Sequence, residues 1–192
     1  MTSLSTVVDL HRVLSDPAYA PRHGWHDDHR DADGTPAYRP AVQQVRAEFL
    51  ALAEVLRARG LCGSCLQLGL GECDASHALW REIFARVVTI DWRACLVDDE
   101  ITFRPGMDTG SRSAFELAYQ HSPYDLIFID AGHSYEEVRR DHRTYGPLLR
   151  PRGIVAFHDA LPRAAYPEVE VWRYVKEIGA HVIGDEVGVA WL

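Results

Sequence analysis

The sequence predicts an α/β fold in which helices cover both faces of a mostly parallel, seven-stranded sheet that ends in a C-terminal antiparallel hairpin. Two observations lead to this prediction. Short, unbroken apolar runs alternate with helix-like segments, which is typical of parallel strands buried on both faces. The last two runs are separated only by a turn around Gly184 and Asp185, which indicates a hairpin that closes the sheet.

The predicted elements follow one another in a regular order. A long amphipathic helix comes first, because apolar residues recur at helical spacing until Gly60 provides a C-terminal stop. The predicted helices cover residues 40–60, 76–85, 111–120, 134–149 and 168–178. The predicted strands cover residues 65–68, 87–90, 101–103, 126–129, 154–157, 181–183 and 187–192. Ser134, followed three residues later by Glu137, is expected to form a capping box at a helix start.

Two regions are expected along the chain. Residues 40–192 form a single ligand-binding domain, and residues 1–39 form an irregular N-terminal cap or lid, because Pro and Gly interrupt a weakly periodic, polar segment. His23, His26 and His29 in that segment fit a solvated lid better than a second metal site, since Gly24 argues against a helix that would align them.

Composition restricts the classes of function. The chain has 192 residues, 47% hydrophobic and 25% charged, which is typical of one globular domain. Acidic residues outnumber basic ones 28 to 20, so a nucleic-acid backbone would be repelled. No apolar stretch approaches the ~20 residues that span a bilayer, and no signal-like segment is present, so we expect a cytoplasmic protein without a membrane partner. The cysteines, including the pair Cys62 and Cys65, are expected to be reduced thiols.

The carboxyl ends of parallel strands form the edge at which open α/β sheets bind ligands. Gly69 and Gly71 follow the first strand and allow a tight turn close to a ligand. A dinucleotide fingerprint would have a third glycine where Asp74 stands, so NAD is disfavoured. Asp91 ends the second strand, where a carboxylate can accept hydrogen bonds from a ribose or, alternatively, cap a helix. Asp108 follows the third strand, near the expected adenine edge or in a plain turn.

Four polar residues follow the fourth and fifth strands. Asp130 and His133 come after one, and His158 and Asp159 after its neighbour, so all four should meet at one point of the sheet edge. An imidazole suits a general base, and carboxylates suit Mg²⁺, with Mn²⁺ acceptable when a histidine takes part. In the alternative interpretation the carboxylates cap helices and the histidines are polar residues satisfied at strand ends.

The motifs at residues 66–71, 91, 128–135 and 157–159 resemble those of the class I S-adenosylmethionine-dependent methyltransferases, which have a Rossmann-like fold. Within them they resemble the small-molecule group that includes cephalosporin hydroxylase-like proteins and metal-dependent O-methyltransferases of macrolide sugars. Gln67 stands where this family usually has an acidic residue, and His158 differs from the acidic residue of the sugar enzymes.

The resemblance implies a role for each candidate residue. Gly69, Gly71, Ser76, Asp91 and Asp108 would bind S-adenosylmethionine, with the ribose on Asp91. Asp130, His158 and Asp159 would hold a divalent metal, Mg²⁺ or Mn²⁺, and His133 would be the general base.

The expected function is O-methylation of a hydroxyl on a small molecule, such as a natural product or a sugar-containing metabolite. The alternatives are an NAD-linked oxidoreductase and a non-catalytic nucleoside-binding module on the same fold. Assembly into a homo-oligomer is left open.

Overall fold

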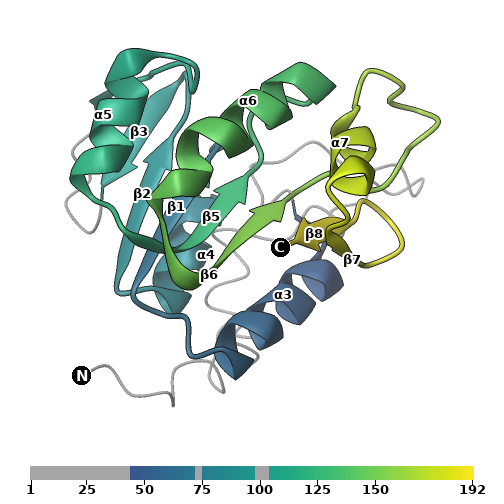
Figure 1. Cartoon of the computed structure of the whole chain (residues 1–192), viewed down its shortest axis with the longest axis horizontal. Helices are drawn as coiled ribbons and strands as arrows, with labels where there is room; N and C mark the ends of the chain where they lie inside the picture. The colour runs from purple at the N-terminus through teal and green to yellow at the C-terminus, as the bar shows by residue number, and fades with distance from the viewer. Residues whose placement is uncertain (1–43, 72–74, 98–103) are drawn as a thin grey trace, which may run out of the picture.

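The structure is a computed structural model that describes residues 44–71, 75–97 and 104–192. These residues form one eight-stranded sheet, in the order β4-β3-β2-β1-β5-β6-β8-β7, with helices on both of its faces (Figure 1). The predicted cap at residues 1–39 and the predicted strand at 101–103 lie outside the described residues. None of the helices in the described ranges is long and apolar enough to cross a membrane.

The observed elements match the predicted order. The helices are α3 (Arg46–Ala58), α4 (Ala75–Ile83), α5 (Arg112–Gln120), α6 (Tyr135–Tyr145) and α7 (Val171–Glu177), with a 3₁₀ helix at Gly146–Leu148. The strands are β1 (Ser64–Leu68), β2 (Arg86–Ile90), β3 (Ala94–Val97), β4 (Arg104–Pro105), β5 (Tyr124–Ile129), β6 (Leu149–Phe157), β7 (His181–Ile183) and β8 (Val189–Trp191). The helix predicted to reach residue 149 was too long, because the chain tightens at Gly146 and Pro147 and β6 begins at Leu149.

The strand pairing confirms the parallel core and the terminal hairpin. Strands β2, β1, β5 and β6 are parallel neighbours, whereas β8 pairs antiparallel with β6 and β7 antiparallel with β8. Strand β3 was not predicted. It follows β2 too closely for the crossover that a parallel strand needs, so it returns antiparallel to β2, and the two-residue β4 then pairs with it.

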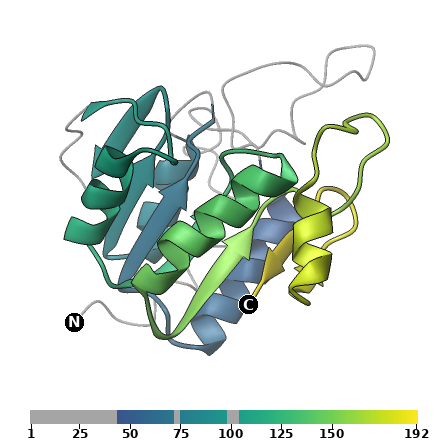
Figure 2. The same ribbon diagram turned by 45° about the horizontal axis from the view of Figure 1, so that its top comes forward.

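Alternate residues of the central strands enter two separate cores. On one face α3 and α4 pack against residues such as Leu126 and Phe128 of β5. On the other face α5, α6 and α7 pack against residues such as Ile127 and Ile129 of the same strand. Figures 1 and 2 show α6 between α5 and α7 in both views. Burial on both faces explains why these strands are continuous apolar runs.

A buried carboxylate joins the first described helix to the last hairpin. The side chain of Glu48 in α3 accepts hydrogen bonds from the backbone N–H groups of Glu186 (3.2 Å), Val187 (3.2 Å) and Gly188 (3.0 Å). Glu48 is only 2% exposed, so water cannot replace these bonds. The carboxylate therefore fixes the turn between β7 and β8 against α3.

Replacing Glu48 with alanine should lower the free energy of unfolding by about 3 kcal/mol, because several buried N–H donors would lose a charged acceptor. Urea denaturation measures this change. The matched control is Glu54→Ala on the same helix, where an exposed pair with Arg57 should contribute less than about 0.5 kcal/mol. Equal losses in the two variants would contradict a structural role for Glu48.

Candidate active site

A glycine turn brings the end of β1 against the end of β5. Gly69 has φ +93° and Gly71 has φ +74°, a backbone region that side chains other than glycine rarely adopt. A Cβ atom on Gly69 would lie 1.9 Å from the carbonyl oxygen of Asp130. Glycine at position 69 is therefore required for this close approach.

Asp91 holds two neighbouring turns together at the end of β2. One carboxylate oxygen accepts a hydrogen bond from the Leu70 N–H (2.8 Å) and the other from the Arg93 N–H (2.7 Å). The structure contradicts the alternative of a helix N-cap, because the segment after Asp91 leads into β3. Each oxygen keeps a lone pair, so the ribose contact stays a prediction.

A buried polar network lies beneath the glycine turn. The Gln67 amide donates to the Ser76 hydroxyl (2.6 Å) and to the Gly69 carbonyl (2.8 Å), and its oxygen accepts from the Thr89 hydroxyl (3.1 Å). Thr89 in turn lies 2.7 Å from Nδ1 of His77. Ser76 thus faces this network in the structure, and its contact with a cofactor stays a prediction.

Asp108 lies in an exposed turn whose next residue is fixed to α6. Its carboxylate accepts a hydrogen bond from the Gly110 N–H (2.6 Å). The Thr109 hydroxyl donates to the buried Asp141 (2.9 Å) and accepts from Arg140 (2.8 Å). This anchoring fixes the loop before α5 while Asp108 itself remains exposed at the surface.

The structure brings Asp130, His133, His158 and Asp159 together, as predicted from the two strand ends. Nε2 of His133 lies 2.9 Å from Oδ2 of Asp159 and 3.8 Å from Oδ1 of Asp130. Nδ1 of His158 lies 3.2 Å from Oδ1 of Asp130 and 3.4 Å from Oδ2 of Asp159. Both histidines therefore contact both carboxylates.

Charge pairing fixes the protonation of these four residues. Hydrogen bonds to Asp130 and Asp159 raise the pKa of His133 to about 10. Burial alone would lower the pKa of His158, but the same carboxylates raise it to about 10. Burial would raise the pKa of each carboxyl, yet the histidines hold the pKa of Asp130 and of Asp159 below the usual range. His133 can therefore act as a base only after it has lost this proton.

The donor atoms of the cluster fit a divalent cation. Asp130, His133 and Asp159 each offer one ligand atom within 4.8 Å of the others, in the mixture of oxygen and imidazole nitrogen that Mg²⁺ or Mn²⁺ accepts. His158, the imidazole predicted as a ligand, lies outside this set. Its Nε2 is buried and has no hydrogen-bond partner among the described residues. The roles expected of the two histidines, His133 as the base and His158 as a ligand, stay predictions.

The loop that carries His133 is held at both of its ends. Ser134 and Glu137 form the predicted capping box at the start of α6, which is confirmed. From the other side, the Glu170 N–H donates to the His133 carbonyl (2.8 Å), and the Glu170 carboxylate accepts from the Tyr135 N–H (3.3 Å). The imidazole therefore projects from a backbone with little freedom to move.

Comparison with known protein families identifies the chain. A family model described as a methyltransferase domain matches residues 48–160, more than half of the chain. The chain belongs to this methyltransferase family. The match includes the glycine turn, Asp91 and all four clustered residues, and it confirms the resemblance to class I S-adenosylmethionine-dependent methyltransferases.

Solved structures share the fold of this methyltransferase. A Staphylococcus aureus protein provisionally assigned as a caffeoyl-CoA O-methyltransferase has a TM-score of 0.61 and 16% identity over 98% of this chain and 97% of its own. An O-methyltransferase from Bacillus cereus has a TM-score of 0.55 and 17% identity, over 97% and 89%. MycE, from the mycinamycin biosynthetic pathway, has a TM-score of 0.52 and 17% identity, over 73% and 47%.

Two of these matches are to much longer proteins. The methyltransferase spans about half the length of MycE. An uncharacterized protein of Sinorhizobium fredii, y4gI, is 36% identical over 61 residues, which is 32% of this chain and 6% of that protein.

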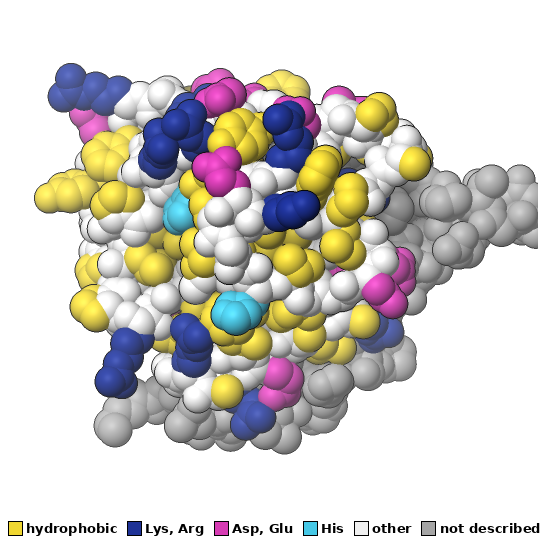
Figure 3. All heavy atoms as spheres, turned by 45° about the vertical axis from the view of Figure 1, so that its right-hand side comes forward, with side chains coloured by type: hydrophobic (Ala, Val, Ile, Leu, Met, Phe, Trp, Pro, Cys, Tyr) yellow, Lys and Arg dark blue, Asp and Glu magenta, His cyan; other side chains and the backbone are white. Residues whose placement is uncertain are grey.

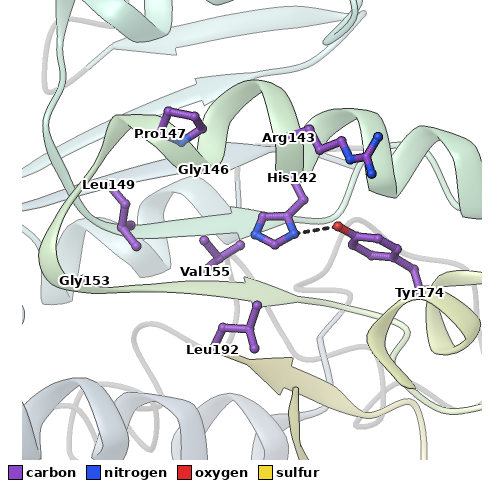
Figure 4. A pocket seen from close by; sticks show the side chains of 9 residues that line it. All are labelled: His142, Arg143, Gly146, Pro147, Leu149, Gly153, Val155, Tyr174 and Leu192. Atoms are coloured by element: carbon purple, nitrogen blue, oxygen red, sulfur yellow. Dashed lines mark hydrogen bonds between the residues drawn. The ribbon is translucent and has the colours of Figure 1, made fainter. Parts of the chain in front are cut away.

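A separate groove of about 480 Å³ lies between α6, β6 and α7. Figure 4 shows His142 and Tyr174 hydrogen-bonded across it, with the imidazole nitrogen 2.8 Å from the phenol oxygen. None of the predicted site residues lines this groove. Figure 3, which views the molecule from the right-hand side of Figure 1, shows hydrophobic, basic and acidic side chains mixed on that face. The groove is therefore distinct from the candidate active site.

Two residues that contact the cluster were not predicted. The Gln44 amide donates to Oδ2 of Asp130 (2.8 Å), and Arg163 forms an ion pair with Asp159. Gln44 precedes α3 and Arg163 lies in the segment between β6 and α7. Gln44 is 86 positions from Asp130, so only the tertiary fold brings them together, whereas Arg163 lies four residues after Asp159 in a segment without a recognisable motif.

Proposed function

We propose that this methyltransferase transfers the methyl group of S-adenosylmethionine to a hydroxyl of a small molecule. The observation that carries the proposal is the convergence of Asp130, His133 and Asp159 at the carboxyl edge of the sheet, directly beside the turn at Gly69. A cofactor bound over that turn would place its methyl group near a candidate base. The Bacillus cereus relative was solved with S-adenosylhomocysteine, which supports the choice of cofactor.

The cofactor would lie across the ends of β1 and β2. Gly69 and Gly71 leave the backbone open to the methionine part, and Asp91 offers carboxylate lone pairs to the ribose. The side chain of Arg93 donates to the Gly71 carbonyl (3.1 Å), which keeps the two turns in one arrangement. Asp108 and Ser76 complete the proposed set of cofactor residues.

Methyl transfer requires an acceptor oxygen that is deprotonated and aligned with the sulfonium. In the proposed step the hydroxyl proton passes to Nε2 of neutral His133. The acceptor oxygen forms the new bond to the methyl carbon, and the carbon–sulfur bond breaks with its electrons moving to sulfur. The products are the methyl ether, protonated His133 and S-adenosylhomocysteine.

The carboxylates of Asp130 and Asp159 would hold a divalent cation at the same place, while the Nε2 lone pair of His133 stays available for the proton of the acceptor. When bound, Mg²⁺ or Mn²⁺ lowers the pKa of an acceptor hydroxyl and orients it. His158 contacts both carboxylates through Nδ1 and thereby keeps them close to each other. The bound cation would also neutralise the carboxylates of Asp130 and Asp159. Since these carboxylates raise the pKa of His133, the imidazole would then lose its proton more readily.

The proposed acceptors are natural products or sugar-containing metabolites. MycE, which shares the fold, was solved with Mg, S-adenosylhomocysteine and mycinamycin VI. Because the chain spans about half of MycE, the acceptor of the present protein must be found by experiment. Transfer of labelled methyl from S-adenosylmethionine to a panel of hydroxylated macrolides, sugars and phenols, with and without chelator, tests the proposal.

Calorimetry separates this proposal from its alternatives. Binding of S-adenosylhomocysteine with labelled product in the panel supports a methyltransferase, and binding without any product favours a nucleoside-binding module. Binding of NAD in place of S-adenosylhomocysteine would overturn the proposal.

The substitution Asp91→Ala should weaken the binding of S-adenosylhomocysteine by about 1.5–3 kcal/mol, because hydrogen bonds from the ribose to a charged acceptor would be lost. Isothermal titration calorimetry measures the change. Glu116→Ala, which removes an exposed carboxylate on α5, is the control and should leave the affinity unaltered. An unaltered affinity in Asp91→Ala as well would remove the ribose assignment.

A further inference from the structure

In Asp130 and in Asp159, one carboxylate oxygen contacts the two histidines and the other contacts a different residue. Oδ1 of Asp130 and Oδ2 of Asp159 face inward, where both histidines contact them. The outer Oδ2 of Asp130 accepts from the Gln44 amide, and the outer Oδ1 of Asp159 pairs with Arg163. The outer partners thus orient the two inner oxygens toward each other.

The outer partners differ in charge. Gln44 is neutral and 3% exposed, and its Oε1 is buried without a hydrogen-bond partner among the described residues. Arg163 is permanently charged, and its guanidinium lies 4.8 Å from the centre of the Tyr166 ring. The Asp159 side chain is 5% exposed, so water and salt screen its ion pair only weakly.

This difference in charge between Gln44 and Arg163 would affect any cation that binds Oδ1 of Asp130 and Oδ2 of Asp159. A divalent ion on Oδ2 of Asp159 would share one carboxylate with the guanidinium of Arg163, and the two positive charges would repel each other. On Asp130 the amide of Gln44 orients the carboxylate without adding charge. The two sides of the site therefore have opposite effects on a metal ion.

We propose that Arg163 is a built-in counter-ion that competes with a divalent cation for Asp159, whereas Gln44 orients Asp130 for that cation. This inference rests on the metal site of the proposed function. Arg163 lies four residues after Asp159 in a segment outside helices and strands, so its side chain can leave the carboxylate without disturbing an element of the fold. Binding of a cation to Asp159 would then favour release of Arg163 from that carboxylate, and the ion pair with Arg163 would weaken cation binding.

The test is the affinity of the full chain for Mn²⁺, followed by electron paramagnetic resonance at neutral pH in the presence of S-adenosylhomocysteine. Arg163→Met keeps the length of the side chain and removes the charge, so Mn²⁺ should bind about tenfold more tightly, or 1.4 kcal/mol. Arg163→Lys keeps the charge and should remain close to the wild type. Gln44→Met removes the orienting amide and should weaken binding by about tenfold.

Arg112→Met is the matched control, because the Arg112 side chain is 91% exposed and pairs with Glu116 on α5. It should leave Mn²⁺ binding unchanged. Thermal unfolding monitored by circular dichroism checks that each variant is folded, and Arg163→Gln replaces Arg163→Met if the latter is not.

Unchanged or weaker Mn²⁺ binding in the neutral Arg163 variants would overturn the counter-ion role while leaving the metal site in place. Absence of Mn²⁺ binding from the wild type and from every variant would overturn the metal site and this inference together. Calorimetric binding of S-adenosylhomocysteine and transfer of labelled methyl to the acceptor panel, measured on the same samples, report separately on the cofactor and on the activity, so failure of the proposed methyltransferase activity is distinguished from both outcomes.

Discussion

Replacement of His133 by alanine is expected to slow methyl transfer by about 10²–10⁴-fold, because the acceptor hydroxyl would lose its general base. Binding of S-adenosylhomocysteine should remain intact, since the imidazole projects toward the carboxylates Asp130 and Asp159. The residual rate should rise with pH as the acceptor ionises unaided. The wild-type rate should also fall as pH decreases, but its midpoint should lie at the pKa of His133, because the protonated ring cannot accept a proton. One product assay across pH, with the acceptor found in the panel, measures both effects.

His181→Ala is the control for this experiment, because His181 is an exposed histidine on β7 that packs against Trp191. Its rate should match that of the wild type. A wild-type rate in His133→Ala would reject the base assignment and favour a structural role at the start of α6.

The substitution Gly69→Ala is expected to lower the free energy of unfolding by about 3–4 kcal/mol, the sum of left-handed backbone strain and overpacking. The added Cβ atom would lie 1.9 Å from the carbonyl oxygen of Asp130, so the ends of β1 and β5 would have to separate. That separation would also displace the Asp130 carboxylate, and Mn²⁺ binding should weaken. Urea denaturation and paramagnetic resonance measure the two effects.

Gly60→Ala separates the two causes of this loss. Gly60 also has a positive φ, +69°, but a Cβ atom there would meet nothing within 4 Å. Its cost should be the backbone strain alone, about 1–2 kcal/mol. If Gly69→Ala and Gly60→Ala lowered the free energy of unfolding by the same amount, the close contact of the added Cβ atom with Asp130 would contribute nothing to the loss.

Most of the fold follows from local patterns in the sequence. The strands of the parallel core were predicted because burial on both faces makes them unbroken apolar runs, as in β5. Strand β3 was missed because its four residues follow β2 so closely that they looked like part of a connecting segment. The end of α6 was misplaced because the helical pattern of polar and apolar residues continues into the 3₁₀ turn at Gly146–Leu148.

The site was predictable only where it depends on strand ends. Asp130 and Asp159 follow apolar strands, and adjacent parallel strands bring such residues together. Gln44 and Arg163 also contact these carboxylates. Gln44 lies within the predicted helix 40–60, whose apolar spacing does not indicate what a polar side chain contacts, and Arg163 lies in a segment without periodicity. Both imidazoles contact the two inner oxygens, so the spacing of residues along the chain could not show which of them would serve as a metal ligand.

The bond between Glu48 and the turn at residues 186–188 has a consequence for the order in which the protein can fold. The carboxylate and its partners are 138 to 140 positions apart, so α3 leaves the ribosome long before the amides that satisfy its buried charge. Until they appear, β6 has no neighbour on its outer side and is an edge strand open to pairing with other chains. We therefore expect the nascent domain to depend on chaperones until its last hairpin is synthesised.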